Sequence, residues 1–246
     1  MICFNTNGKS RTKIETQIPQ GGACGYAVPG CRLLANEILL FWAENGNGRP
    51  LSVFIPGGTC STAIILHREL RRIQSESDPA CRMDIEVVVI PCVGDEGYAE
   101  RQMMALNMET GGTGEKNEIP KVLKPAPMAS FYLEGADNLR YFRFGEPDLD
   151  ILNSFREMEG CGVKIDLLYG APAWNVLLRH WPVDGDADFG NFLAGREIMY
   201  VHSGGLEGIN SQLMRYRHRG LVEGNEVQHP ERQRRASKEF LDTSPE

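Results

Sequence analysis

The sequence lacks long hydrophobic runs and lacks an excess of positive charge. No apolar stretch approaches the roughly 20 residues that a membrane-spanning helix requires, and Met1–Thr6 does not begin a secretory signal. The net charge is −7, whereas a general nucleic-acid binder needs a basic face that displaces counterions. We therefore expect a soluble, intracellular, cytoplasmic protein that binds neither nucleic acid nor membrane.

Paired-cysteine motifs are missing as well. The seven cysteines include no C-x-x-C, and none is spaced with a histidine as zinc ligands are. An odd number of scattered cysteines favours reduced thiols, several of them buried, over disulfides. We expect no bound metal.

Three common active-site signatures are also absent: the P-loop, the dinucleotide-binding G-x-G-x-x-G and the G-x-S-x-G nucleophile turn. What remains is ordinary globular composition, with 41% hydrophobic and 24% charged residues in 246. This is enough for one large domain.

Strands and helices alternate along the chain. Residues 85–91 are the clearest strand, since they form the continuous, β-branched run typical of a parallel sheet covered on both faces. Further strands are expected at 13–18, 51–55, 163–169 and 197–201, and helices at 63–74, 95–108, 147–159, 173–180 and 206–216. Another helix ends at Gly46, and its apolar face is predicted to be Cys31, Leu34, Ile38, Phe41 and Trp42. The alternation predicts an α/β fold, with a mostly parallel sheet and helices on both faces.

Two segments depart from this alternation. Residues 109–127 contain a run of glycines and three prolines, and predict an exposed linker or lid. From Gly220 the chain becomes polar and charged, which predicts a disordered tail at 220–246 after one domain at 1–219.

The strongest local motif lies at 55–63, where a predicted strand meets a predicted helix. Gly57 and Gly58 let a ligand approach the backbone closely, and three hydroxyl residues follow them. Backbone N–H groups at a helix N-terminus favour an anion. The motif predicts a phosphate site, or, without a ligand, a turn in which Ser61 or Thr62 caps the helix.

Two more predicted strand ends carry candidate residues, Tyr169 and Ser203. The carboxyl ends of parallel strands open into one ligand crevice, so both side chains could face the phosphate turn. The alternative for Tyr169 is packing at the sheet edge. His202, next to Ser203, is interpreted as structural rather than catalytic.

In their order along the chain, these motifs resemble the 1-aminocyclopropane-1-carboxylate deaminase and D-cysteine desulfhydrase family. The similar stretches are 18–23, 54–63, 90–96, 144–147, 166–169 and 200–208, and the resemblance covers about residues 14–216. It implies the large-domain portion of a pyridoxal-phosphate enzyme of the tryptophan-synthase-β-like fold type II, lacking the N-terminal part.

The resemblance also implies roles for individual residues. Ser203 would lie beside the pyridine ring, Tyr169 would be catalytic near the substrate, and the cofactor phosphate would bind, mostly through backbone N–H groups, to Gly57, Gly58, Thr59, Cys60, Ser61 and Thr62. The family converts small amino acids to ammonia and a 2-oxo acid, with sulfide from cysteine. A homodimer is expected.

The chain departs from the family at the lysine that carries the cofactor. Asn7–Arg11 only faintly resembles the Gly-Asn-Lys-x-Arg pattern, and the Ser-Asn pair that would hold the substrate carboxylate does not occur. Gly170 stands where an acid or hydroxyl residue would meet the pyridine nitrogen. We therefore expect impaired lyase or deaminase activity. The alternative is a catalytically inactive protein that binds pyridoxal phosphate or another phosphate ligand.

Overall fold

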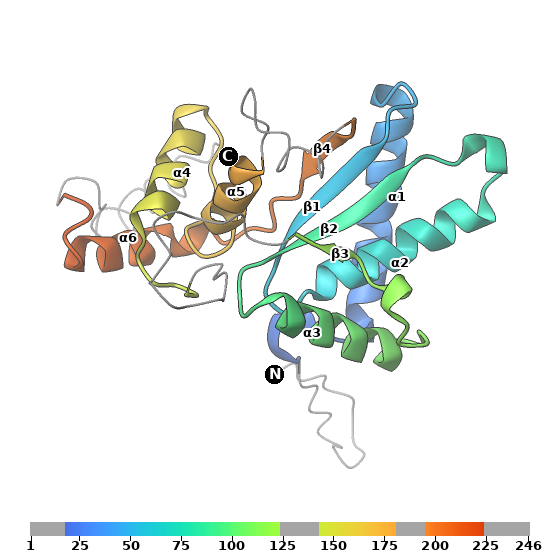
Figure 1. Cartoon of the computed structure of the whole chain (residues 1–246), viewed down its shortest axis with the longest axis horizontal. Coiled ribbons are helices and arrows are strands. Elements are labelled where there is room, and N and C mark those ends of the chain that lie inside the picture. The colour runs from blue at the N-terminus through green and yellow to red at the C-terminus, as the bar shows by residue number, and fades with distance from the viewer. Residues whose placement is uncertain (1–17, 124–142, 181–194, 224–246) are drawn as a thin grey trace, which may run out of the picture.

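A computed structural model describes residues 18–123, 143–180 and 195–223. Its centre is a parallel sheet with strand order β3-β2-β1-β4 (Figure 1). The strands are β1 (Leu51–Gly57), β2 (Ile85–Pro91), β3 (Lys121–Val122) and β4 (Glu197–Tyr200). The helices are α1 (Val28–Asn45), α2 (Ser61–Glu76), α3 (Glu96–Glu109), α4 (Leu149–Gly160), α5 (Gly170–Arg179) and α6 (Ile209–His218).

Successive residues of the two central strands point to opposite faces of the sheet. The face toward α1, α2 and α3 buries aliphatic residues of both strands: Leu51, Val53, Ile55, Val87 and Val89. The other face buries Phe54, Val88 and Ile90 against α5. Figure 1 shows the sheet between these two groups of helices. The predicted α/β class, with a parallel sheet and helices on both faces, is confirmed.

A third apolar cluster joins α4, α5 and α6 beside the sheet. Leu152 of α4, Ala171 of α5 and Tyr216 of α6 are buried in it. Val222 also packs into this cluster, so the packed part of the chain continues past α6. The rest of the predicted tail, residues 224–246, lies outside the described residues.

A polar network ties the amino ends of the central strands together. The Arg196 guanidinium donates to the Ser52 hydroxyl at 2.9 Å and to both carboxylate oxygens of Asp84 at 2.9 Å. Ser52 in turn donates to Glu86 at 2.7 Å, although it is fully buried in β1. These groups satisfy one another's hydrogen bonds, whereas the ligand crevice expected of a parallel sheet lies at the carboxyl ends of its strands.

The strand predicted at 163–169 is wrong. The Asp166 carboxylate accepts hydrogen bonds from the backbone N–H groups of Leu168, Tyr169 and Gly170, at 2.7–2.8 Å. An aspartate that binds the backbone just after itself competes with a strand ladder, and here it produces a turn leading into α5.

Three smaller predictions also need correction or fall outside the structure. Phe41 is 52% exposed rather than buried, because α1 turns Ala35 and Leu39 toward the core instead. Residues 109–127 are not a simple linker, since β3 lies within them and extends the sheet beside β2. Most of the strand predicted at 13–18 lies outside the described residues.

Phe54 and Phe41 form a matched pair for testing this packing. Phe54→Ala removes a fully buried side chain and should lower the free energy of unfolding by about 3–5 kcal/mol. Phe41→Ala removes an exposed one and should change it by about 0.5 kcal/mol or less. Urea unfolding measures both variants, and equal losses would contradict the packing described here.

His67 of α2 should make stability depend on pH. Burial, helped by the nearby Arg71 charge, lowers its pKa from 6.5 to about 4, and its Nε2 is buried without a partner among the described residues. The unfolded chain therefore binds this proton more readily, so stability should fall as the pH drops from about 6.5 to about 4, by as much as about 3 kcal/mol. His67→Gln should remove this part of the pH dependence of urea unfolding. An unchanged slope would assign the dependence to other groups.

Candidate functional site

The carboxyl end of β1 runs directly into the N-terminus of α2, which has no side-chain cap. Cys60 is the residue before the helix, and it adopts the left-handed conformation with φ 59° and ψ 15°. Among the described residues, no oxygen accepts a hydrogen bond from the backbone N–H groups of residues 58–63. The capping role considered for Ser61 or Thr62 is therefore wrong, and the loop presents a row of unpaired donors.

The hydroxyl groups of the loop hold a neighbouring turn instead. The Ser61 hydroxyl donates to the Gly21 carbonyl at 2.9 Å and lies 3.1 Å from the Thr59 hydroxyl. A Cβ on Gly21 would come within 2.5 Å of the Thr59 hydroxyl oxygen, and Gly21 has a φ of +64°. The turn at Gln20–Gly22 therefore fits against the loop only because a glycine is present there.

Cys60 contributes only its backbone to the loop. Its side chain is 4% exposed and turns toward the Gly58 carbonyl, at 3.8 Å. Burial raises the pKa of the thiol to about 12, so that it is neutral at physiological pH. Thr62 is half-buried one residue into α2.

Tyr169 lies directly over the loop. A Cβ on Gly58 would be 3.2 Å from the Tyr169 ring and 3.3 Å from its hydroxyl oxygen. The ring of Phe144 packs on Tyr169 with the centroids 5.4 Å apart. Burial, together with the nearby Cys92 and Asp166, raises the pKa of the Tyr169 phenol. The structure therefore brings together Tyr169 and the predicted phosphate loop, with a protonated hydroxyl beside the unpaired N–H groups.

Asp166 is the residue that positions Tyr169, and the sequence analysis missed this role. Its carboxylate is 4% exposed and binds the Tyr169 N–H at 2.7 Å. A Cβ on Gly170 would lie 3.0 Å from the same carboxylate, so that no larger residue fits at that position. An aspartate a few residues before a predicted helix is the signal that could have revealed this turn.

Ser203 is less closely associated with the loop between β1 and α2 than Tyr169 is. The register pairs Phe54 with Tyr200, so the chain after β4 leaves the sheet beside the end of β1. Ser203 is exposed there. Gly205 packs on Asp166, where its Cβ would be 3.0 Å from the carboxyl carbon. Within the described part of the chain, Ser203 forms no hydrogen bond to the loop.

Among the described lysines, none forms a hydrogen bond or an ion pair with the loop between β1 and α2. Lys116 and Lys121 bind the carboxylates of Glu100 and Glu86, and Lys164 is exposed after α4. Lys9 lies outside the described residues. Within the described ranges, no cluster of three or more His, Cys, Asp or Glu side chains could hold a metal ion. No helix in those ranges is both long and apolar enough to cross a membrane.

Searches of protein-family models and of curated proteins return no match to this chain. The site is therefore defined by its own geometry: unpaired N–H groups at the start of α2, a protonated phenol above them, and a buried carboxylate that positions the phenol.

Asp166→Ala should lower the free energy of unfolding by about 1–3 kcal/mol, because three backbone N–H groups lose their acceptor. Asp78 is a suitable control, since it accepts a single N–H bond at the exposed turn before Pro79–Cys81. Asp78→Ala should cost about 1 kcal/mol or less. Thermal unfolding of both variants measures the difference, and a larger loss in Asp78→Ala would contradict the role of Asp166.

Proposed function

We propose that the chain binds pyridoxal phosphate, with the cofactor phosphate at the loop between β1 and α2. We also propose that it acts as a lyase or deaminase of small amino acids, of the 1-aminocyclopropane-1-carboxylate deaminase or D-cysteine desulfhydrase type. The fold would then be the large domain of fold type II. The observation that carries the proposal is the uncapped N-terminus of α2, with the unpaired N–H groups of residues 58–63.

The residues present suit a phosphate group. The N-terminal end of a helix carries a partial positive charge, and free N–H groups there donate to phosphate oxygens. Gly58 leaves room beside the Tyr169 ring, since a Cβ there would lie 3.2 Å from it. The Ser61 hydroxyl donates to the Gly21 carbonyl of the Gln20–Gly22 turn and lies beside the Thr59 hydroxyl. Phosphate contacts would therefore come mostly from the backbone.

When bound, pyridoxal phosphate supplies an electron sink that stabilises negative charge on the carbon next to the substrate amine. The chain's own residues would orient the ligand and move protons. Tyr169 would hold a proton on its hydroxyl oxygen, beside Gly58, where it could donate to the substrate. Asp166 would act only by positioning Tyr169. Ser203 would meet the pyridine ring from the neighbouring strand end.

A second candidate is a protein that binds the phosphate ligand without turning over a substrate. The observation that favours it is that Lys116 and Lys121 are paired with carboxylates away from the loop. Binding and turnover must therefore be measured separately.

Binding should depend on the ligand's phosphate. We expect the chain to bind pyridoxal phosphate at least about tenfold more tightly than pyridoxal, because only the phosphate reaches the start of α2. Gly58→Ala places a methyl group 3.2 Å from the Tyr169 ring and should weaken pyridoxal phosphate binding about tenfold. Gly25→Ala is the matched control, since a Cβ there meets no atom within 4 Å. Equilibrium dialysis with absorbance detection measures all three proteins.

Equal affinity for pyridoxal and pyridoxal phosphate would exclude the loop as a phosphate site. Turnover is tested with D-cysteine and with 1-aminocyclopropane-1-carboxylate, by following sulfide, ammonia and the 2-oxo acid. Borohydride trapping followed by mass spectrometry locates any lysine that carries the cofactor. Tight binding without product would favour the second candidate.

A further inference from the structure

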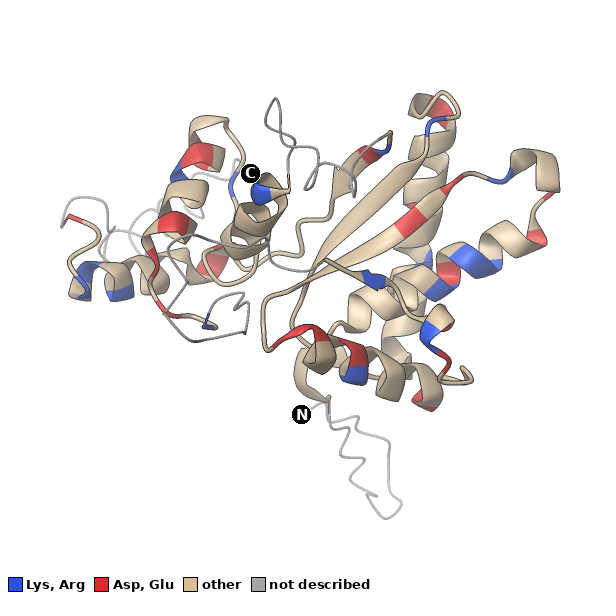
Figure 2. Ribbon diagram, viewed as in Figure 1, with Lys and Arg blue, Asp and Glu red and all other residues tan. Residues whose placement is uncertain are grey.

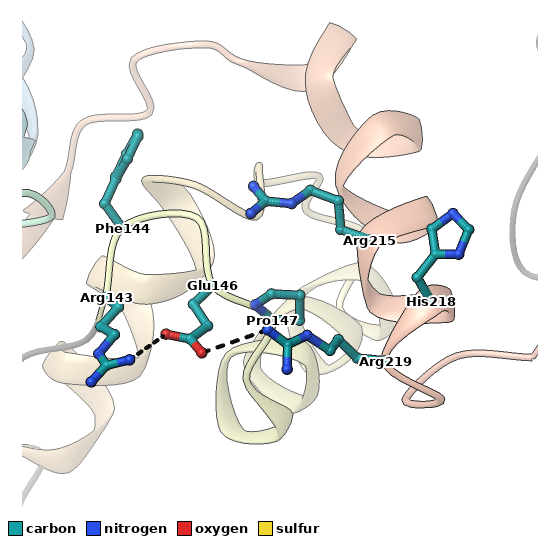
Figure 3. Close-up of a pocket in the computed structure, with 7 residues that line it drawn as sticks. All are labelled: Arg143, Phe144, Glu146, Pro147, Arg215, His218 and Arg219. Carbon is teal, nitrogen blue, oxygen red and sulfur yellow. Dashed lines mark ion pairs between the residues drawn. The ribbon is translucent and has the colours of Figure 1, made fainter.

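A basic pocket lies between the segment 143–147 and the C-terminal end of α6. It has a volume of about 540 Å³ and is lined by Arg143, Phe144, Glu146, Pro147, Arg215, His218 and Arg219. Figure 3 shows arginines from both segments around it. Neither the phosphate loop nor the proposed reaction involves the charged side chains of this pocket.

The pocket is positively charged within an acidic protein. Three arginines line it against one carboxylate, Glu146, whereas the whole chain carries a net charge of −7. Figure 2 shows the basic residues at the C-terminal end of α6. A local charge opposite in sign to the net charge of the chain attracts a ligand of the other sign, here an anion.

Glu146 does not neutralise the pocket. It lies 3.6 Å from Arg143 and 4.0 Å from Arg219, so that both ion pairs are long. Arg215 has no carboxylate partner among the described residues, and its side chain donates to the Gln212 side-chain oxygen at 3.4 Å. Donors of all three guanidinium groups are therefore available to a ligand.

The fold holds Arg215 in position. A Cβ on Gly145 would be 3.0 Å from an Arg215 side-chain nitrogen, so the glycine leaves room for the guanidinium over the backbone. Leu213 and Tyr216 anchor α6 in the apolar cluster with α4 and α5. Arg215 and Arg219 are four residues apart and share one face of the helix.

Basic residues in the last turn of a helix also favour its negative end. That effect accounts for Arg215, Arg217 and His218, which lie in the last turn of α6, but not for Arg143, which reaches the pocket from a different segment. Convergence from two segments is the feature expected of a binding site.

We propose that this pocket binds a small molecule through an oxyanion group, a phosphate or a carboxylate. Guanidinium groups form paired hydrogen bonds with either group, and the volume is within the range of small-molecule sites. The site is separate from the phosphate loop, although Phe144 lines the pocket and packs on Tyr169. A ligand in the pocket would thus lie close to Tyr169, the proposed catalytic residue.

Isothermal titration calorimetry at low salt tests the proposal, with inorganic pyrophosphate and citrate as the two probes. At least one should bind, and added sodium chloride should weaken the binding. Arg215→Ala and Arg219→Ala should each weaken it about tenfold. Arg217→Ala is the matched control, because it removes the same charge from the same helix outside the pocket and should have little effect. Tighter pyrophosphate binding assigns a phosphate ligand, and tighter citrate binding a carboxylate.

Absence of binding by both probes overturns the proposal, as does an equal loss in Arg217→Ala and Arg215→Ala. Pyrophosphate could instead bind at the loop before α2. In that case Gly58→Ala would weaken binding and Arg215→Ala would not, which overturns the pocket while supporting the loop. Unchanged thermal unfolding of each variant shows that a loss of binding is not a loss of folding.

Discussion

The parallel pairing of β1 with β2 is the constraint on which the other elements depend. The seven pairs run from Leu51 with Ile85 to Gly57 with Pro91, and both faces of this pair are buried. Parallel strands require a long crossover connection, which here is α2, and its start therefore lies at the carboxyl end of β1. The arginine network around Arg196 satisfies the opposite end of the sheet. The unpaired N–H groups of residues 58–63 lie at the carboxyl end of β1, opposite this network.

Asp166 connects the carboxyl end of the sheet to the group formed by α4, α5 and α6. Its carboxylate accepts hydrogen bonds from the N–H groups of Tyr169 and Gly170, the first residue of α5, while Gly205 packs on the same carboxyl group. One buried carboxylate thus sets the position of the phenol above the loop, the start of a helix and the path of the chain after β4. A substitution at Asp166 would disturb all three features, because the same carboxyl group contacts each of them.

The two proposed binding regions share an aromatic contact. Phe144 packs on Tyr169 above the phosphate loop, and it also lines the basic pocket against α6. Gly145 lets the Arg215 guanidinium approach the adjacent backbone. A ligand in the pocket would restrict the segment that carries Phe144, and through it the surroundings of Tyr169. The proximity of the two regions is a consequence of the short segment between Arg143 and Pro147.

From the residues alone, the α/β class, the strand at Ile85–Pro91 and the loop at Gly57–Ser61 could be predicted, since alternating periodicity and glycines after a buried strand are local patterns. The turn that carries Tyr169 to Gly58 could not, because the Asp166 carboxylate accepts hydrogen bonds from the backbone where a strand is predicted. Nor could the convergence of Arg143 with Arg215, which lie 72 positions apart in the sequence. Long-range packing decides such contacts, and no local pattern encodes it.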